Sequence, residues 1–171
     1  MSKRKNMLIL FSFLYIMVIV AFTVNSFKVS AKPYHKVYEG GLYRESDHTY
    51  FEKSSITFDG MLSNPLIGKS RFIGRITYLE RDYDVDISFK DGEGDYITDI
   101  KNYTGANSNL GILYADEDLE KVTILIFEYN DMYIESWNAR TGLILSGEAH
   151  DREMARSITR KNLEKSIYNV N

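Results

Sequence analysis

The chain changes its hydrophobic pattern twice. Residues 7–24 form an apolar run without a charge, residues 36–146 alternate apolar and polar positions between turn signals, and residues 151–168 show helical spacing. Continuous apolarity is typical of a helix in nonpolar surroundings, a period of two is typical of strands, and a period near 3.6 is typical of an amphipathic helix. The patterns therefore predict an N-terminal helix, a β-rich region and a C-terminal helix.

The apolar run follows a basic cluster at residues 3–5 (Lys-Arg-Lys). At about 1.5 Å per residue, residues 7–24 would span roughly 27 Å as a helix, close to the ~30 Å hydrocarbon core of a bilayer. A basic segment before such a run favours an N-terminus in the cytoplasm and the rest of the chain outside. We therefore expect residues 1–6 to be cytoplasmic and residues 7–24 to be a transmembrane or signal-peptide helix in the cell membrane.

Two fates of this segment stay open. A cleaved signal peptide has an apolar stretch of about 7–15 residues followed by small residues before the cut. Val29 and Ala31 supply such residues for a signal-peptidase cut between Ala31 and Lys32, which would give a secreted protein. The longer apolar run favours a permanent single-pass anchor instead. Because the chain has no cysteine, a lipid-modified N-terminal cysteine is excluded.

The middle of the chain predicts antiparallel strands. The clearest strand covers residues 84–90, where Val85, Ile87 and Phe89 alternate with polar residues. Further strands are predicted at 72–78, 96–101, 110–114, 122–127, 133–137 and 143–146, with turns or loops at 91–95, 104–109, 116–119, 130–131 and 138–142. Residues 122–127 are apolar on both alternating faces, so this strand is expected to be central and covered on both sides.

The last segment predicts a helix at about 151–168. Asp151 fits an N-cap, and the residues at 154, 155, 158, 159, 162, 163, 166 and 170 share one broad face. We expect this helix to pack on the central strand and to supply its second cover. The predicted fold is mainly β: an antiparallel sandwich, or a strongly curved, partly closed sheet, with one C-terminal helix. Residues 25–35 are expected to be a linker, and residues 36–171 a single extracytoplasmic domain.

The charge and cysteine content of the chain limit the classes of molecule that the domain is expected to bind. All 24 acidic residues lie beyond position 32, together with 16 of the 21 basic residues, so the outer domain carries a net charge of −8 with neutral histidines. Such a domain is a poor electrostatic match for nucleic acid. The absence of cysteine means that the domain must be stable without disulfides, which fits a Gram-positive type of surface.

Acidic clusters are the first candidates for chemistry. The segment 82–86 (Asp-Tyr-Asp-Val-Asp) has carboxylates at alternate positions. The segment 91–95 (Asp-Gly-Glu-Gly-Asp) resembles the start of a calcium loop, but Tyr96 and Asn102 stand where that loop needs Gly and Glu. We expect solvent-facing strand positions in the first segment and a hairpin turn in the second, with weak calcium binding as the alternative. The three histidines are far apart, and no nucleophile or zinc motif is present, so no catalytic residue, metal or cofactor is assigned.

Aromatic residues are the remaining candidates. Exposed tyrosine and tryptophan side chains can form a platform for a sugar or peptide, because they combine area with a polar edge. Tyr38, Tyr43, Tyr133 and Trp137 are the candidate ligand-binding residues. All of them lie in predicted strands, so strand core and cross-strand pairing are the competing interpretation.

One block of sequence resembles a known group of proteins. It runs through residues 56–60 (Ile-Thr-Phe-Asp-Gly), 65–69 (Pro-Leu-Ile-Gly-Lys) and 72–76 (Phe-Ile-Gly-Arg-Ile). The block resembles small uncharacterised exported or single-pass membrane proteins of Gram-positive bacteria. The resemblance implies location and a β-rich domain, and it carries over no activity and no site residues.

These observations favour a non-enzymatic, membrane-tethered binding module for a protein or envelope component. One alternative is a cell-envelope hydrolase or transferase that uses Asp84, Asp86 or Glu93. A further alternative is self-association through an uncovered sheet edge.

Overall fold

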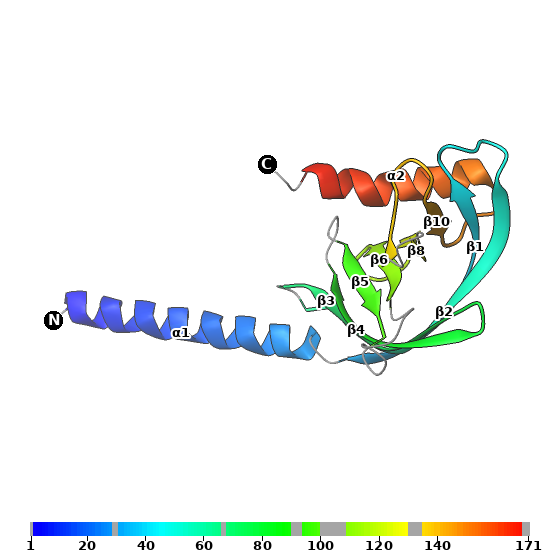
Figure 1. Ribbon diagram of the computed structural model, residues 1–171. Coiled ribbons are helices and arrows are strands. Elements are labelled where there is room, and N and C mark those ends of the chain that lie inside the picture. The colour runs from blue at the N-terminus through cyan, green and yellow to red at the C-terminus, as the bar shows by residue number, and fades with distance from the viewer. Residues whose placement is uncertain are drawn as a thin grey trace.

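The computed structural model describes residues 2–28, 31–65, 68–89, 94–99, 109–129 and 135–168. Its elements are α1 (Ser2–Lys28), β1 (Lys32–Arg44), β2 (Phe51–Ser63), β3 (Ser70–Tyr78), β4 (Arg81–Phe89), β5 (Asp95–Thr98), β6 (Asn109–Ala115), β7 (Val122–Ile126), β8 (Glu128–Tyr129), β9 (Glu135–Ser136), β10 (Leu143–Ser146) and α2 (Arg152–Tyr168). Figure 1 shows a curled sheet with α2 lying across it and α1 extending away from it.

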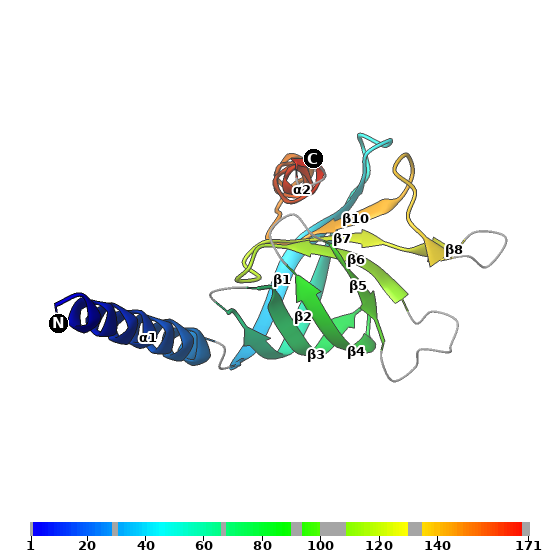
Figure 2. The same cartoon turned by 90° about the vertical axis from the view of Figure 1, so that its left-hand side faces the viewer.

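Eight strands form one antiparallel sheet in the order β4-β3-β2-β1-β10-β7-β6-β5. The sheet curls until its two edge strands, β4 and β5, approach each other (Figures 1 and 2). Across this seam, the backbone N–H of Ser88 donates to a carboxylate oxygen of Asp95 at 2.9 Å. The result is a nearly closed barrel, and β8 and β9 form a separate two-stranded ribbon.

Strand alternation fills the barrel interior. On β4, Val85, Ile87 and Phe89 point inward, while Asp86 and Ser88 between them point outward. Phe58 meets Tyr38 and Phe72 edge to face, with ring centroids 5.3 and 5.4 Å apart. An eight-stranded barrel encloses a space that side chains can just fill, and here buried aromatic and aliphatic side chains occupy it.

Helix α2 covers the outside of β1, β10, β7 and β6. Its first turn is capped by Asp151, whose carboxylate accepts the backbone N–H of Met154 at 2.8 Å. On β7, Ile124 faces the barrel interior and Leu125 faces α2, next to Ala155 and Ile158. The expected double cover of the central strand is therefore found.

The predicted fold class is confirmed in its coarse form: a mainly β chain with a nearly closed antiparallel sheet and one C-terminal helix. Of the two alternatives, the structure contains the partly closed sheet and not the sandwich, because eight of the described strands belong to a single sheet. The predicted turns and strands around 90–93, 100–108 and 130–134 lie wholly or partly outside the described residues.

The structure differs from the predicted boundaries at the linker. Strand β1 begins at Lys32, because residues 32–35 pair with residues 59–62 of β2. The local pattern there is mixed and includes Pro33, which is compatible with a strand near its first residue. The pairing is therefore set by β2 rather than by local propensity.

The middle of helix α1 carries exposed apolar side chains. Every large apolar side chain that the structure describes in α1 is between 44% and 73% exposed. Within the described residues, no helix meets the combination of length and apolarity required for crossing a membrane.

Candidate functional site: the open face of strands β1 to β4

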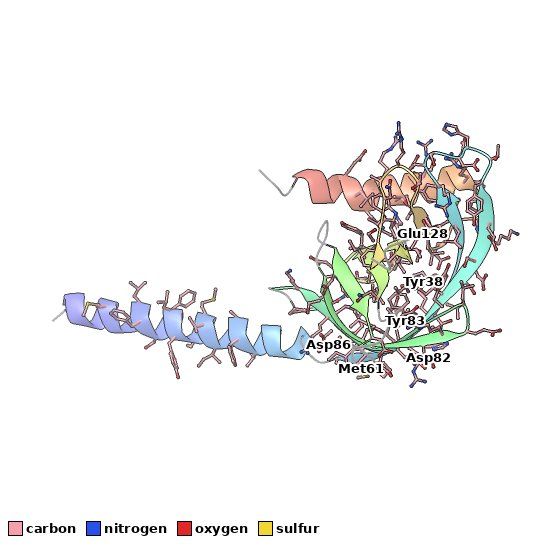
Figure 3. The ribbon with its side chains drawn as sticks, viewed as in Figure 1. Tyr38, Met61, Asp82, Tyr83, Asp86 and Glu128 are labelled. Atoms are coloured by element: carbon pink, nitrogen blue, oxygen red, sulfur yellow. The ribbon has the colours of Figure 1, made fainter. Side chains whose placement is uncertain are left out.

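In the described part of the chain, α2 packs on β1, β10, β7 and β6, and the outer surface of β2, β3, β4 and the first residues of β1 lies beyond these contacts. We call this surface the open face. Its outward-pointing residues include Pro33, His35, Val37, Thr57, Asp59, Met61, Arg71, Ile73, Arg75, Thr77, Asp82, Asp84 and Asp86. In Figure 3, Met61, Asp82 and Asp86 lie along the outside of these strands, whereas Tyr38 and Tyr83 lie inside the barrel. Helix α2 packs on the other half of the sheet, so the open face is available to other molecules.

Strand register arranges the open face in rows across the sheet. One row is apolar on three strands: Pro33 pairs with Met61, and Met61 pairs with Ile73, while Asp86 on β4 pairs with Ile73 and ends the row. The next row is charged, because His35 pairs with Asp59, Asp59 with Arg75 and Arg75 with Asp84. Directly opposed side chains of one face lie within contact distance in an antiparallel sheet, so each row acts as a unit.

The charged part of the open face is linked by ion pairs. Arg71 binds Asp86 with two bonds, 2.7 Å from Nε and 2.5 Å from Nη2. Arg75 lies between two carboxylates, 3.4 Å from Asp82 and 3.6 Å from Asp84. The hydroxyl of Thr77 donates to Asp82 at 2.7 Å. Exposed pairs of this kind add little stability, so their main consequence is a patterned surface of alternating sign.

The ion pair with Arg71 also affects the pKa of Asp86. The hydrogen bonds from Arg71 hold the pKa of Asp86 below its usual range, so this carboxylate stays ionised near neutral pH. A general acid needs a raised carboxyl pKa instead. Two of the three carboxylates considered as catalytic, Asp84 and Asp86, lie together on the open face and have arginine partners. The third, Glu93, lies outside the described residues.

The open face does not offer a metal site. In the described part of the chain, no three His, Cys, Asp or Glu side chains come together in a way that could hold a metal ion. The aspartates of the open face are interleaved with arginines, which compete for the same oxygen atoms.

The apolar row stands out because its position should be polar. Outward residues of a one-sided sheet are normally polar, yet Met61 is 40% exposed and Ile73 is 44% exposed. Pro33 beside them is exposed as well. Sequence reasoning missed this row and the arginines that border it. The signal that could have found it is Ile73, an apolar residue at an outward position of an otherwise regular strand.

The aromatic candidates are not brought together. Tyr38 and Tyr43 point to opposite faces of β1, and both are buried. Trp137 is half-buried and donates its indole N–H to the carbonyl of Leu143 at 3.1 Å. Tyr133 lies outside the described residues. A ligand-binding role of these residues stays a prediction, and the two tyrosines have no exposed surface for it in this structure.

The hydroxyl of Tyr38 instead binds the turn between β6 and β7 at one end of the barrel. The turn between β6 and β7 places the carbonyl of Leu119 against the hydroxyls of Tyr34 and Tyr38, which both reach it and lie 2.7 Å from each other. Lys36 donates to the carbonyl of Glu120 at 3.2 Å. Burial raises the pKa of Tyr38, and the hydrogen bond that its hydroxyl shares with Tyr34 adds to this shift.

The possible cleavage point lies at the edge of the fold. Ala31 precedes β1, and Lys32 is the first residue of β1, where it pairs with Leu62. The described hydrophobic core contains no residue from α1. A cut after Ala31 would therefore leave every described strand intact.

No protein-family model, curated protein or solved structure matches the chain.

Proposed function

We propose that this protein is a membrane-tethered, non-catalytic binding module, with the barrel outside the cytoplasm and α1 as its anchor. The observation that carries the tether is α1 itself, whose described apolar side chains are exposed on every side. A helix that is apolar all round is typical of a buried or membrane setting. The run at 7–24 has no charge, and the basic residues at 3–5 favour a cytoplasmic N-terminus.

Binding is favoured over catalysis by two features of the barrel. The described interior is filled by side chains such as Phe58, Phe72 and Phe89, all of which are fully buried. The carboxylates Asp84 and Asp86 lie on a convex surface and are neutralised by arginines. A catalytic site usually needs a concave, water-excluding pocket with perturbed acids or bases. The patterned charges of the open face instead suit a partner surface of matching charge.

The tether is tested by fractionation of the full chain expressed in a bacterial host. We expect full-length mass in the membrane fraction, resistant to alkaline carbonate. The pair Leu14→Arg/Val18→Arg should shift the protein out of the membrane, because each central charge costs about 2.5–3.5 kcal/mol in a membrane helix. The apolar pair Leu14→Val/Val18→Leu is the control. Equal membrane retention of the arginine pair would contradict the anchor.

A second candidate has its own support, because β1 begins directly at Lys32. A product that starts at Lys32 and appears in the medium would identify a released protein. The same mass measurement therefore distinguishes the anchored form from the secreted form.

The binding role is tested with the full chain immobilised in detergent micelles. We expect saturable binding of one envelope component, with at least a tenfold loss for Arg71→Glu/Arg75→Glu, because reversal of charge opposes a complementary surface. The exposed change Lys53→Glu, outside the open-face rows, is the matched control. Turnover of cell-wall material that disappears with Asp84→Ala/Asp86→Ala would instead support the hydrolase or transferase.

A further inference from the structure

The apolar row of the open face lies next to the end of the anchor. Pro33 is the second residue of β1, and Met61 and Ile73 follow it across β2 and β3. Helix α1 ends at Lys28, so only three residues separate it from β1. At about 3.3–3.6 Å per extended residue, the start of β1 stays within roughly 14 Å of the helix end. Figure 1 shows α1 meeting the barrel at the beginning of β1.

Charges of both signs lie beside the row. Lys32 lies one residue closer to this end of the barrel than Pro33, and Arg71 lies two residues closer than Ile73. Asp59 lies two residues from Met61 on β2, about 7 Å farther from this end. Asp86 pairs with Ile73 at the β4 end of the row, and its carboxylate is bound by the guanidinium of Arg71. Cationic side chains with long apolar stems favour lipid headgroups.

We propose that Pro33, Met61 and Ile73 rest on the outer lipid surface beside α1 and hold the barrel against its own bilayer. This inference rests on the proposed function, because it needs α1 to be the anchor. Its occupant is the headgroup region of the bilayer that holds α1.

The size of the patch argues for lipid over a protein partner. A stable protein interface buries about 800 Å² on each side, and this row offers three partly exposed side chains. A tether changes that requirement, because it keeps the row at a high effective concentration beside the surface. A contact too small to recruit the barrel from solution is then enough to orient it.

The test uses full chains with one cysteine each, which is clean because the natural chain has none. Met61→Cys and Ile73→Cys are labelled with an environment-sensitive dye in vesicles of phosphatidylcholine and phosphatidylglycerol. Ser55→Cys is the matched control, since it is exposed on the same side of β2, about 20 Å farther along the strand. We expect a blue shift and at least twofold quenching by headgroup nitroxide lipids at positions 61 and 73, and neither at position 55.

Carbonate extraction of the same vesicles separates this inference from the proposed function. Retained protein with solvent-like, unquenched dye at 61 and 73 would overturn the lipid contact and leave the tether standing. Protein lost on extraction would overturn the tether itself. A blue shift that grows with the protein-to-lipid ratio, without lipid quenching, would mean that a second copy covers the row, which also overturns the proposal.

Discussion

Three buried hydroxyls beneath α2 have no hydrogen-bond partner among the described residues: those of Tyr43, Ser146 and Thr159. Thr123 lies in the same interface but accepts a hydrogen bond from the side-chain amide of Asn162 at 3.0 Å. The hydroxyl of Thr159 lies near that of Tyr43 and partly opposes the effect of burial on its pKa, without reaching hydrogen-bond geometry. A buried polar group without a partner costs about 1–3 kcal/mol, so these residues have opposite effects on stability.

The two threonines form a matched pair for mutation. In a barrel fragment that starts at Lys32, Thr159→Val should raise the free energy of unfolding by about 1 kcal/mol, because it removes an unsatisfied hydroxyl. Thr123→Val should lower it by about 1–2 kcal/mol, because it leaves the amide of Asn162 without its acceptor. Urea denaturation measures both. Equal destabilisation by the two changes would mean that Thr159 is satisfied, for example by a bound water molecule.

At the scale of elements, β1 is the strand on which the barrel depends. It pairs with β2 on one side and β10 on the other, and it carries Tyr34, Tyr38 and Tyr43. Burial raises the pKa of each of these tyrosines, that of Tyr43 to about 12. A raised tyrosine pKa means that the folded barrel disfavours the phenolate. The resulting stability is present below the unfolded pKa of about 10 and is lost as the pH rises through the folded pKa.

We therefore expect alkaline sensitivity. The free energy of unfolding of the fragment should be flat from neutral pH to near pH 10 as far as these tyrosines decide it, and should then fall. Each tyrosine that titrates only in the unfolded chain contributes about 1.4 kcal/mol per pH unit. Tyr43→Phe should make this fall shallower by about that amount between pH 10 and pH 12. An unchanged slope, followed by urea denaturation and tyrosinate absorbance, would contradict the assignment.

At the scale of the whole molecule, the sequence predicts those elements that depend on the pattern of neighbouring residues. The double cover of Val122–Ile126, the strand Leu143–Ser146 and the helix that begins after Asp151 follow from periodicity and capping, and all are found. The choice between a sandwich and a partly closed sheet, and the length of β1, were not predictable, because both depend on pairing partners that are distant in sequence.

In the candidate site too, the features set by local pattern were predicted and those set by distant pairing were not. Its aspartates were identified as solvent-facing from alternation alone, and Asp82, Asp84 and Asp86 lie on the open face as expected. Their arginine partners and the apolar row were not identified, since they depend on the register between β2, β3 and β4. The roles of Tyr38 and Tyr43 could not be separated, because one strand sends them to opposite sides of the sheet.

The pairing of β1 with β10 has a consequence for the order in which the chain matures. Leu42 pairs with Leu145, so the two residues are synthesised about a hundred positions apart, and at roughly 5–20 residues per second the wait is on the order of 5–20 s. The hairpins of β1 to β4 close within microseconds once their strands are available. Until β10 is synthesised, β1 is therefore an unpaired edge strand of an incomplete sheet. During this interval a strand of a neighbouring nascent chain could pair with β1 in place of β10.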